Sequence, residues 1–146
     1  MKDNKTVEIL LVEDSDQDAE LSIRALKKSN VINNIVRLKN GEEALEFLFG
    51  EGEFEHRSIK NQPKVVLLDL KMPKVDGLEV LKALREREET KELPVVILTS
   101  SKEEQDLVKS YKLGVNSYIV KPVEFSSFTK AVSDIGLYWV LLNQRP

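Results

Sequence analysis

The fold is decided by residues 65–77, which read VVLLDLKMPKVDG. Four consecutive apolar residues, two of them β-branched, lead to Asp69, and Pro73 and Gly77 follow soon after. A short apolar run that ends in this way is typical of a strand buried on both faces of a parallel sheet. Asp69 would then lie at the carboxyl end of a central strand, where open α/β sheets bind their ligands. We therefore interpret Asp69 as the reactive residue.

The size and charge of the chain limit the classes to which it can belong. Its 146 residues suit one domain, and its formal net charge is −3 with 32% charged residues. Because both signs are mixed, no basic tract offers a footprint for nucleic acid or for an anionic membrane. The chain has no cysteine, and its first apolar run is too short for a signal peptide or a membrane span. We expect a cytoplasmic protein that binds neither nucleic acid nor membrane.

Strand-like and helix-like patterns alternate five times along the chain. We predict strands at residues 9–12, 35–38, 65–68, 95–98 and 118–120, and helices at 16–28, 41–49, 77–84, 103–113 and 125–142. This alternation indicates an α/β fold, a doubly wound five-stranded parallel sheet with helices on both faces. Right-handed crossovers around a central first and third strand give the strand order 2-1-3-4-5.

Two connecting segments are predicted to be solvated. Residues 50–63 carry much charge and no period, so we expect a long, mobile surface loop with His56 in solvent. Residues 85–91 read as a charged, solvated end of the third helix. Asp76 and Glu79 are spaced to form a capping box at the start of that helix.

Polar residues stand at the ends of four predicted strands: Glu13 and Asp14, Asp69, Thr99, and Lys121. The winding of the sheet brings these ends to one edge, so three carboxylates meet and repel one another. A hard divalent cation would relieve this repulsion, and Mg²⁺ fits carboxylate, carbonyl and water ligands best. Lys121 could pair with Asp69, and the Thr99 hydroxyl could donate to a phosphate oxygen.

These residues together resemble a known family. Glu13-Asp14, residues 67–77, Thr99-Ser100 and Lys121-Pro122 are similar to the corresponding motifs of the receiver domain of two-component response regulators. The resemblance covers about residues 7–140. It implies a flavodoxin-like fold in which residues 1–146 form a single receiver domain with no output domain.

The resemblance implies a role for each residue at the site. Asp69 would accept a phosphoryl group from a sensor histidine kinase or a phosphotransfer protein. Asp14 and Asp69 would bind Mg²⁺ directly, Glu13 through water, and Lys71 through its backbone carbonyl. The protein would be a phosphoacceptor with slow self-dephosphorylation rather than an enzyme.

The resemblance also implies how the signal would leave the site. Thr99 and Tyr118 would form a switch pair, with Thr99 moving toward the phosphoryl group and Tyr118 rotating inward. The Lys121-Pro122 bond would be cis. The surface formed by the fourth helix, fifth strand and fifth helix would then change its preference for partners.

Further sequence features indicate a subfamily of receivers and the rate at which the acyl phosphate is hydrolysed. The loop at 50–63, the LTSS sequence at 98–101 and the aromatic tail through Trp139 resemble stand-alone receivers that partner bacterial phytochromes. Lys71 and Ser101 occupy positions that tune access of water to the acyl phosphate in this family. Since neither is an acid or an amide, we expect a phosphoryl group that lives longer than in fast chemotaxis-type receivers.

Alternative readings stay open at this point. Asp69 alone could be a capping acid, Thr99 a turn hydroxyl and Lys121 a surface lysine. A phosphatase of the haloacid dehalogenase type also uses a strand-end Asp and Mg²⁺, but it carries a second acid where this chain has Lys71. A receiver-like scaffold without phosphorylation is a third reading. Residues 135–142 are apolar all round, which favours a homodimer interface at the end of the last helix.

Overall fold

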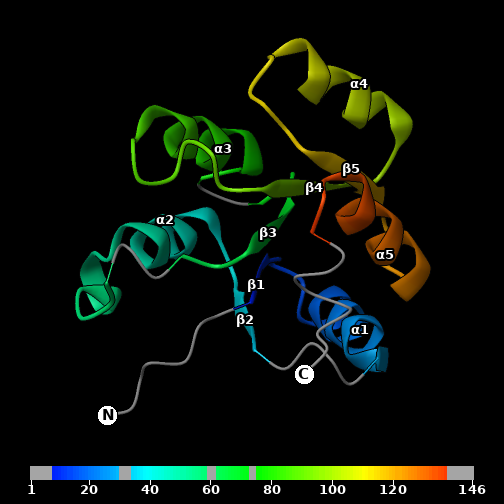
Figure 1. Ribbon diagram of the computed structural model, residues 1–146, viewed down its shortest axis with the longest axis horizontal. Helices are drawn as coiled ribbons and strands as arrows, with labels where there is room; N and C mark the ends of the chain where they lie inside the picture. The colour runs from blue at the N-terminus through cyan, green and yellow to red at the C-terminus, as the bar shows by residue number, and fades with distance from the viewer. Residues whose placement is uncertain (1–7, 30–33, 59–61, 73–74, 138–146) are drawn as a thin grey trace.

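The computed structural model describes residues 8–29, 34–58, 62–72 and 75–137. Within them it confirms the predicted doubly wound fold, a five-stranded parallel sheet with the order β2-β1-β3-β4-β5 (Figure 1). The strands are β1 (Ile9–Val12), β2 (Ile35–Leu38), β3 (Val65–Asp69), β4 (Val95–Thr99) and β5 (Ser117–Val120). The helices are α1 (Asp16–Leu26), α2 (Gly41–Phe49), α3 (Gly77–Glu86), α4 (Lys102–Ser110) and α5 (Phe125–Asp134), with short 3-10 turns η1 (Lys27–Ser29) and η2 (Gly52–Phe54).

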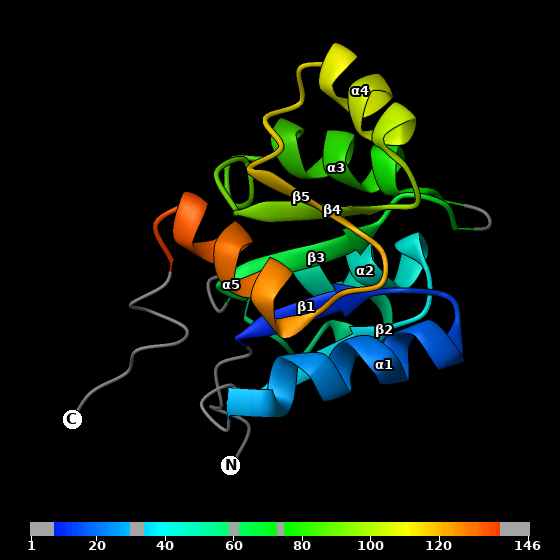
Figure 2. The same cartoon turned by 90° about the vertical axis from the view of Figure 1, so that its right-hand side faces the viewer.

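Helices cover both faces of the sheet, so the central strands are buried on both sides (Figures 1 and 2). Because successive strand residues point to opposite faces, the core divides into two clusters. One cluster lies under α2, α3 and α4 and contains Leu10, Leu68 and Ile97. The other lies under α1 and α5 and contains Leu11, Leu67 and Phe128. None of the helices in these described ranges is long and apolar enough to cross a membrane.

Side-chain caps fix the helices that start beside the site. Ser15 accepts a bond from the backbone of the first turn of α1, and Asn40 does the same for α2. Asp76 and Glu79 form the predicted capping box at the start of α3. Gly50 ends α2 with φ 65°, a left-handed conformation that glycine adopts without steric cost.

The last two helices are shorter than predicted. α4 ends at Ser110 rather than at residue 113, and α5 ends at Asp134. Gly136, two residues after the end of α5, has φ 81°, so the predicted continuation of the helix through residues 135–137 is wrong. Residues 138–142 of the proposed dimer segment, Trp139 among them, lie outside the described residues.

Within the segment 50–63, residues 50–58 carry more structure than the predicted mobile loop. It contains η2, and the Phe54 ring packs edge-on against Phe47 with centroids 5.1 Å apart. The Arg57 guanidinium lies 3.7 Å from the centroid of the same Phe47 ring. His56 is exposed, as predicted. An aromatic ring and a cation therefore hold the start of the loop onto α2.

The inner face and the end of α3 differ in part from what the sequence pattern predicts. The spacing of Leu78, Leu81 and Leu84 predicts that these three residues face the core, and Leu81 and Leu84 are fully buried. Leu78 is only half-buried, and Val80 is fully buried instead. Most of the charged end is exposed as predicted, but Arg85 is half-buried. Its guanidinium donates to main-chain carbonyls of two loops, those of Leu93 (2.9 Å), Leu113 (3.0 Å) and Gly114 (2.8 Å). Apolar spacing does not report such long-range polar contacts.

Candidate functional site

The register of the sheet brings the polar strand ends to one edge. Val12 of β1 pairs with Leu68, so Glu13 and Asp69 follow at the same level on neighbouring strands. Asp69 pairs with Leu98, the residue before Thr99. Thr99 pairs with Val120, the residue before Lys121. All four strand ends named in the sequence therefore meet, as the winding predicted.

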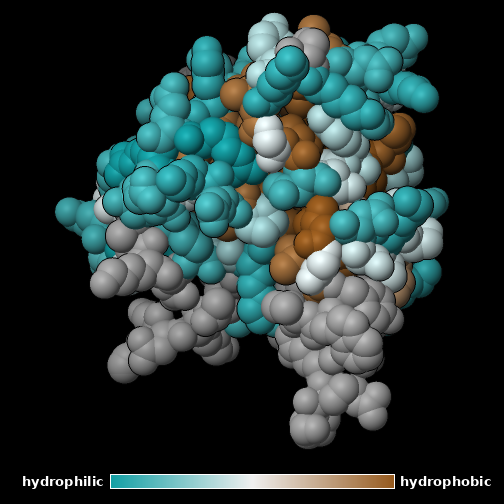
Figure 3. All heavy atoms as spheres, turned by 45° about the horizontal axis from the view of Figure 1, so that its top comes forward, coloured by the Kyte–Doolittle hydropathy of each residue, from teal (hydrophilic) through white to brown (hydrophobic). Residues whose placement is uncertain are grey.

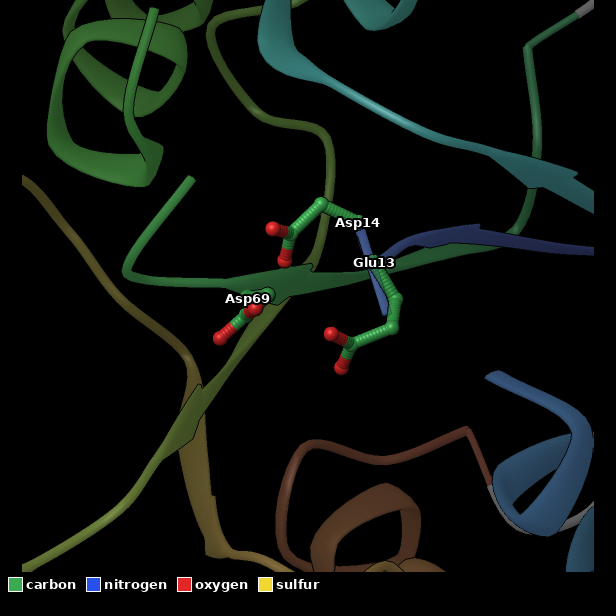
Figure 4. Close-up of side chains that lie close together, drawn as sticks. All are labelled: Glu13, Asp14 and Asp69. Carbon is green, nitrogen blue, oxygen red and sulfur yellow. The ribbon is translucent and has the colours of Figure 1, made fainter. Parts of the chain in front are cut away.

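Three carboxylates gather at this edge. Ligand oxygens of Glu13, Asp14 and Asp69 all lie within 4.8 Å of one another. Figure 4 shows Glu13 and Asp14 reaching from the end of β1 towards Asp69 at the end of β3. Glu13 is fully buried and Asp69 is 4% exposed, whereas Asp14 is open to solvent. The cluster is thus closed on the protein side and open on one side.

Lys121 supplies the positive charge within this cluster. Its Nζ lies 3.3 Å from an oxygen of Asp69 and 3.3 Å from an oxygen of Glu13. The pairing with Asp69 is the one expected from the sequence. A third contact, 3.6 Å to Asp18 on α1, was not expected. The Lys121-Pro122 bond is cis, in agreement with the resemblance.

Burial and crowding change the proton affinity of the site. Burial raises the pKa of Glu13 to about 7, with repulsion from Asp69 adding to the shift. Burial also raises the pKa of Asp69, while Lys121 opposes the shift. Burial lowers the pKa of Lys121, but attraction to Asp69 and Glu13 outweighs it, so the net shift is upward. Glu13 therefore binds a proton more readily than an ordinary carboxyl group does.

The two residues of the expected switch pair lie on neighbouring strands. Thr99 is fully buried at the end of β4, and its Oγ1 has no hydrogen-bond partner within the described ranges. Tyr118 lies on β5 opposite Ile97, half-buried. The Nζ of Lys109 lies 5.5 Å from the centroid of its ring. Burial raises the pKa of Tyr118, so the phenol stays protonated.

Lys71 and Ser101 are both engaged by Glu104 of α4. The Nζ of Lys71 lies 2.9 Å from a Glu104 oxygen, although the Lys71 side chain is otherwise exposed. Ser101 Oγ accepts from the Glu104 backbone at 3.2 Å and caps α4. Burial raises the pKa of Glu104, but the Ser100 amide and Lys71 outweigh this, so the net shift is downward. The ligand role of the Lys71 carbonyl stays a prediction.

Arg37 of β2 is a contact of the site that the sequence did not reveal. Its Nε donates to the main-chain oxygen of Glu13 at 2.9 Å, and its Nη1 donates to Asp16 at 2.8 Å. Acids such as Asp16 and Asp18 are favoured near the N-terminus of a helix by its macrodipole. Both lie in the first turn of α1, and each also has a specific basic partner. Arg37 is a single charged residue within the strand pattern at 35–38, and that pattern does not indicate which residues it contacts.

The residues present fit a divalent cation. The cluster contains three carboxylates, and Lys121 can neutralise only one of their negative charges. The remaining negative charge lies in a largely buried site. Carboxylate oxygens are hard donors, and the open side at Asp14 leaves room for water or a phosphate oxygen. The unpartnered Thr99 hydroxyl is a donor suited to an anionic oxygen. Glu13, Asp14 and Asp69 are the residues that would hold the ion.

A strand-end aspartate, a lysine and an acidic cluster at the edge of a 2-1-3-4-5 sheet define a receiver. The family model of the response regulator receiver domain matches residues 9–133. The chain therefore belongs to the response regulator receiver family and takes part in two-component signalling, as the sequence predicted.

Individual relatives are also similar over most of their length. The bacteriophytochrome response regulator AtBRR is 51% identical with a TM-score of 0.87, over 96% of this chain and 99% of that one. The response regulator Rcp1 of Synechocystis is 39% identical over 90% of this chain and 88% of its own, and its Mn²⁺-bound form has a TM-score of 0.72. The phosphorylated cyanobacterial phytochrome response regulator RcpA is 36% identical with a TM-score of 0.73, over 97% and 98%.

Proposed function

We propose that Asp69 accepts a phosphoryl group from a sensor histidine kinase or a phosphotransfer protein. One observation carries this proposal: a nearly buried carboxylate, paired with Lys121, lies among acidic oxygens at the edge of the sheet where ligands bind. An oxygen of Asp69 would attack the phosphorus while the bond to the donor histidine nitrogen breaks. The product is an acyl phosphate.

The neighbouring residues would bind the cation and stabilise the transferred phosphoryl group. Mg²⁺, when bound, would neutralise the charge of the transferred group. Asp14 and Asp69 would hold it directly, Glu13 through water, and Lys71 through its carbonyl. Lys121, whose Nζ lies 3.3 Å from an Asp69 oxygen, would bind a phosphoryl oxygen after the transfer. Thr99 would donate its unpartnered hydroxyl to the same group.

The signal would leave through the α4–β5–α5 surface, with Thr99 and Tyr118 as the switch. Three large hydrophobic side chains are exposed on α4, just after it, and on β5: Leu107 (52%), Tyr111 (55%) and Val120 (49%). Figure 3 views the molecule with the α4 side turned forward, and hydrophobic residues interrupt its hydrophilic surface. Exposed apolar residues of this kind favour recognition by a protein partner.

The finer identity of the partners belongs to the same proposal. Similarity to AtBRR, Rcp1 and RcpA supports a bacterial phytochrome as the kinase. We also propose a cytoplasmic location, a single receiver domain over residues 1–146, and a homodimer through the C-terminal segment. Light scattering at tens of micromolar in both phosphorylation states tests the dimer, and monomers throughout would contradict it.

The test of the main proposal is incubation with acetyl phosphate and Mg²⁺, followed by intact mass measurement. We expect a single phosphate adduct on the parent protein and none on Asp69→Asn. Thr99→Ser is the matched control, because it keeps the hydroxyl and should still form the adduct. An equal adduct on Asp69→Asn would contradict the proposal.

A phosphatase of the haloacid dehalogenase type is disfavoured by a specific residue. That chemistry needs an acid two residues after the nucleophile, and Lys71 stands there in a 2.9 Å ion pair with Glu104. Turnover of many small phosphate esters in the same incubation would favour the phosphatase instead.

A further inference from the structure

Arg37 joins β2, an edge strand of the sheet, to the loop that carries Glu13 and Asp14. Its side chain is 18% exposed. The Nε donates to the main-chain oxygen of Glu13 at 2.9 Å, and Nη1 donates to an Asp16 carboxylate oxygen at 2.8 Å. One guanidinium therefore holds both ends of the turn between β1 and α1.

The bond to Glu13 fixes a particular peptide group. The oxygen of Glu13 belongs to the peptide that links Glu13 to Asp14, and peptide groups are planar. The amide of Glu13 is held as well, because it donates to the Leu38 oxygen at 3.0 Å. Both peptide planes that flank Glu13 are thus fixed by β2. Those planes set the direction in which the Glu13 side chain leaves the backbone, and the second of them leads into Asp14. The next amide, that of Ser15, donates to the Glu13 carboxylate at 3.2 Å.

One nitrogen of the Arg37 guanidinium makes no hydrogen bond in this position. Nη2 of Arg37 is buried and has no hydrogen-bond partner in the described part of the chain. An unsatisfied buried donor is unfavourable, so the other two bonds must outweigh it. Arg37 contacts a main-chain oxygen and Asp16, and the structure records no contact with a carboxylate of the acidic cluster. Its effect on the cluster is therefore through orientation.

We propose that Arg37 is a positioning residue for divalent-cation binding, which rests on the proposed function. It holds the Glu13–Asp14 peptide so that both carboxylates face Asp69 before the ion arrives. Residues that orient metal ligands typically change metal affinity 10–100-fold when they are removed. A lysine at position 37 retains the charge but has no planar fork that reaches both oxygens at once.

The test is calorimetric titration of Mg²⁺ into the full-length parent, Arg37→Met, Arg37→Lys and Arg24→Met. Arg24 is the matched control, since it is also an arginine paired with an acid of α1, Glu20, and both side chains of that pair are exposed. Urea unfolding in EDTA is measured for each variant to register any general loss of stability. Hydrogen exchange of the Asp14 and Ser15 amides in EDTA reports the order of the loop without any metal.

We expect Arg37→Met to weaken Mg²⁺ binding about tenfold or more and to speed exchange of these two amides. Arg24→Met should change neither, and Arg37→Lys should recover at most part of the affinity. If Arg37→Met binds Mg²⁺ with an affinity within threefold of the parent, this inference is overturned and the proposed function is not. Full recovery in Arg37→Lys would also overturn it, since charge would then suffice. A parent protein that binds no Mg²⁺ would overturn the proposed function and this inference with it.

Discussion

Glu13 is the residue whose environment most departs from that of an ordinary carboxylate. It is fully buried, its oxygens accept from Ser15 and pair with Lys121, and Asp69 lies beside it. Burial raises its pKa from 4.5 to about 7. In the absence of a cation, the ionised site is therefore a source of instability rather than of stability.

This shift predicts a pH dependence for the metal-free protein. Between about pH 4.5 and pH 7 the unfolded chain ionises Glu13 while the folded chain still binds the proton. Stability should therefore fall as pH rises through this window, by as much as roughly 3 kcal/mol, and then level off. Urea unfolding in EDTA from pH 5 to pH 8 measures the slope. Glu13→Gln should flatten it, and parallel slopes for parent and variant would show that Glu13 is not responsible.

The pairing of Lys71 with Glu104 bears on the lifetime of the phosphoryl group. Lys71 Nζ is held at 2.9 Å, and Ser101 Oγ is occupied in capping α4. Neither side chain is free to place a hydrolytic water. We predict a phosphoryl lifetime longer than seconds in Mg²⁺, measured as phosphate release after removal of the donor. A half-life of seconds would refute this.

Single residues were predictable where a local pattern marked them. Glu13, Asp69, Thr99 and Lys121 each end an apolar run, and parallel strands must bring such ends together. Arg37 carries no such mark, because its partners depend on the side-by-side placement of β1 and β2. Lys121 contacts Asp18 for the same kind of reason, through the packing of α1 against α5.

At the scale of elements, the start of α3 is tied closely to the end of β3. Gly77 donates its amide to the Leu70 oxygen at 2.9 Å. A Cβ at position 77 would lie 2.5 Å from the main-chain oxygen of Asp69 and 2.9 Å from the Leu70 Cα. These neighbours are backbone atoms and cannot turn aside. Glycine is required here by close approach rather than by backbone angle.

We therefore expect Gly77→Ala to disturb both stability and the site. The clash should push the helix and the Asp69 backbone apart and cost about 1–3 kcal/mol in the free energy of unfolding. Phosphorylation by acetyl phosphate should be slower as well. Gly136→Ala is the control, since its Cβ would meet no atom within 4 Å and only the backbone angle resists. Equal phosphorylation rates for parent and Gly77→Ala would contradict the account.

Helix starts were predictable and helix ends were less so. Ser15, Asn40 and Asp76 are side-chain caps that a sequence displays directly. The end of α5 was missed because the apolar pattern runs on past Asp134, while Gly136 at φ 81° turns the chain away. Arg85 was missed because its carbonyl partners come from two distant loops.

At the scale of the whole molecule, strand register sets the geometry of the site. Each strand has only four or five residues, and parallel pairing places their carboxyl ends at one level. The two core clusters hold that register from both faces. A slip of one residue would turn the buried side chains to the opposite faces of the sheet and displace Asp69 from Lys121.

Together, the fold and the site predict that phosphorylation occurs on Asp69 and depends on a cation held by the acidic cluster. The most direct measurement is peptide mapping of the acyl phosphate, trapped by borohydride reduction, after reaction with acetyl phosphate in Mg²⁺ or in EDTA. We predict modification at Asp69 in Mg²⁺ and almost none in EDTA. Modification at another residue, or an equal yield in EDTA, would contradict the account.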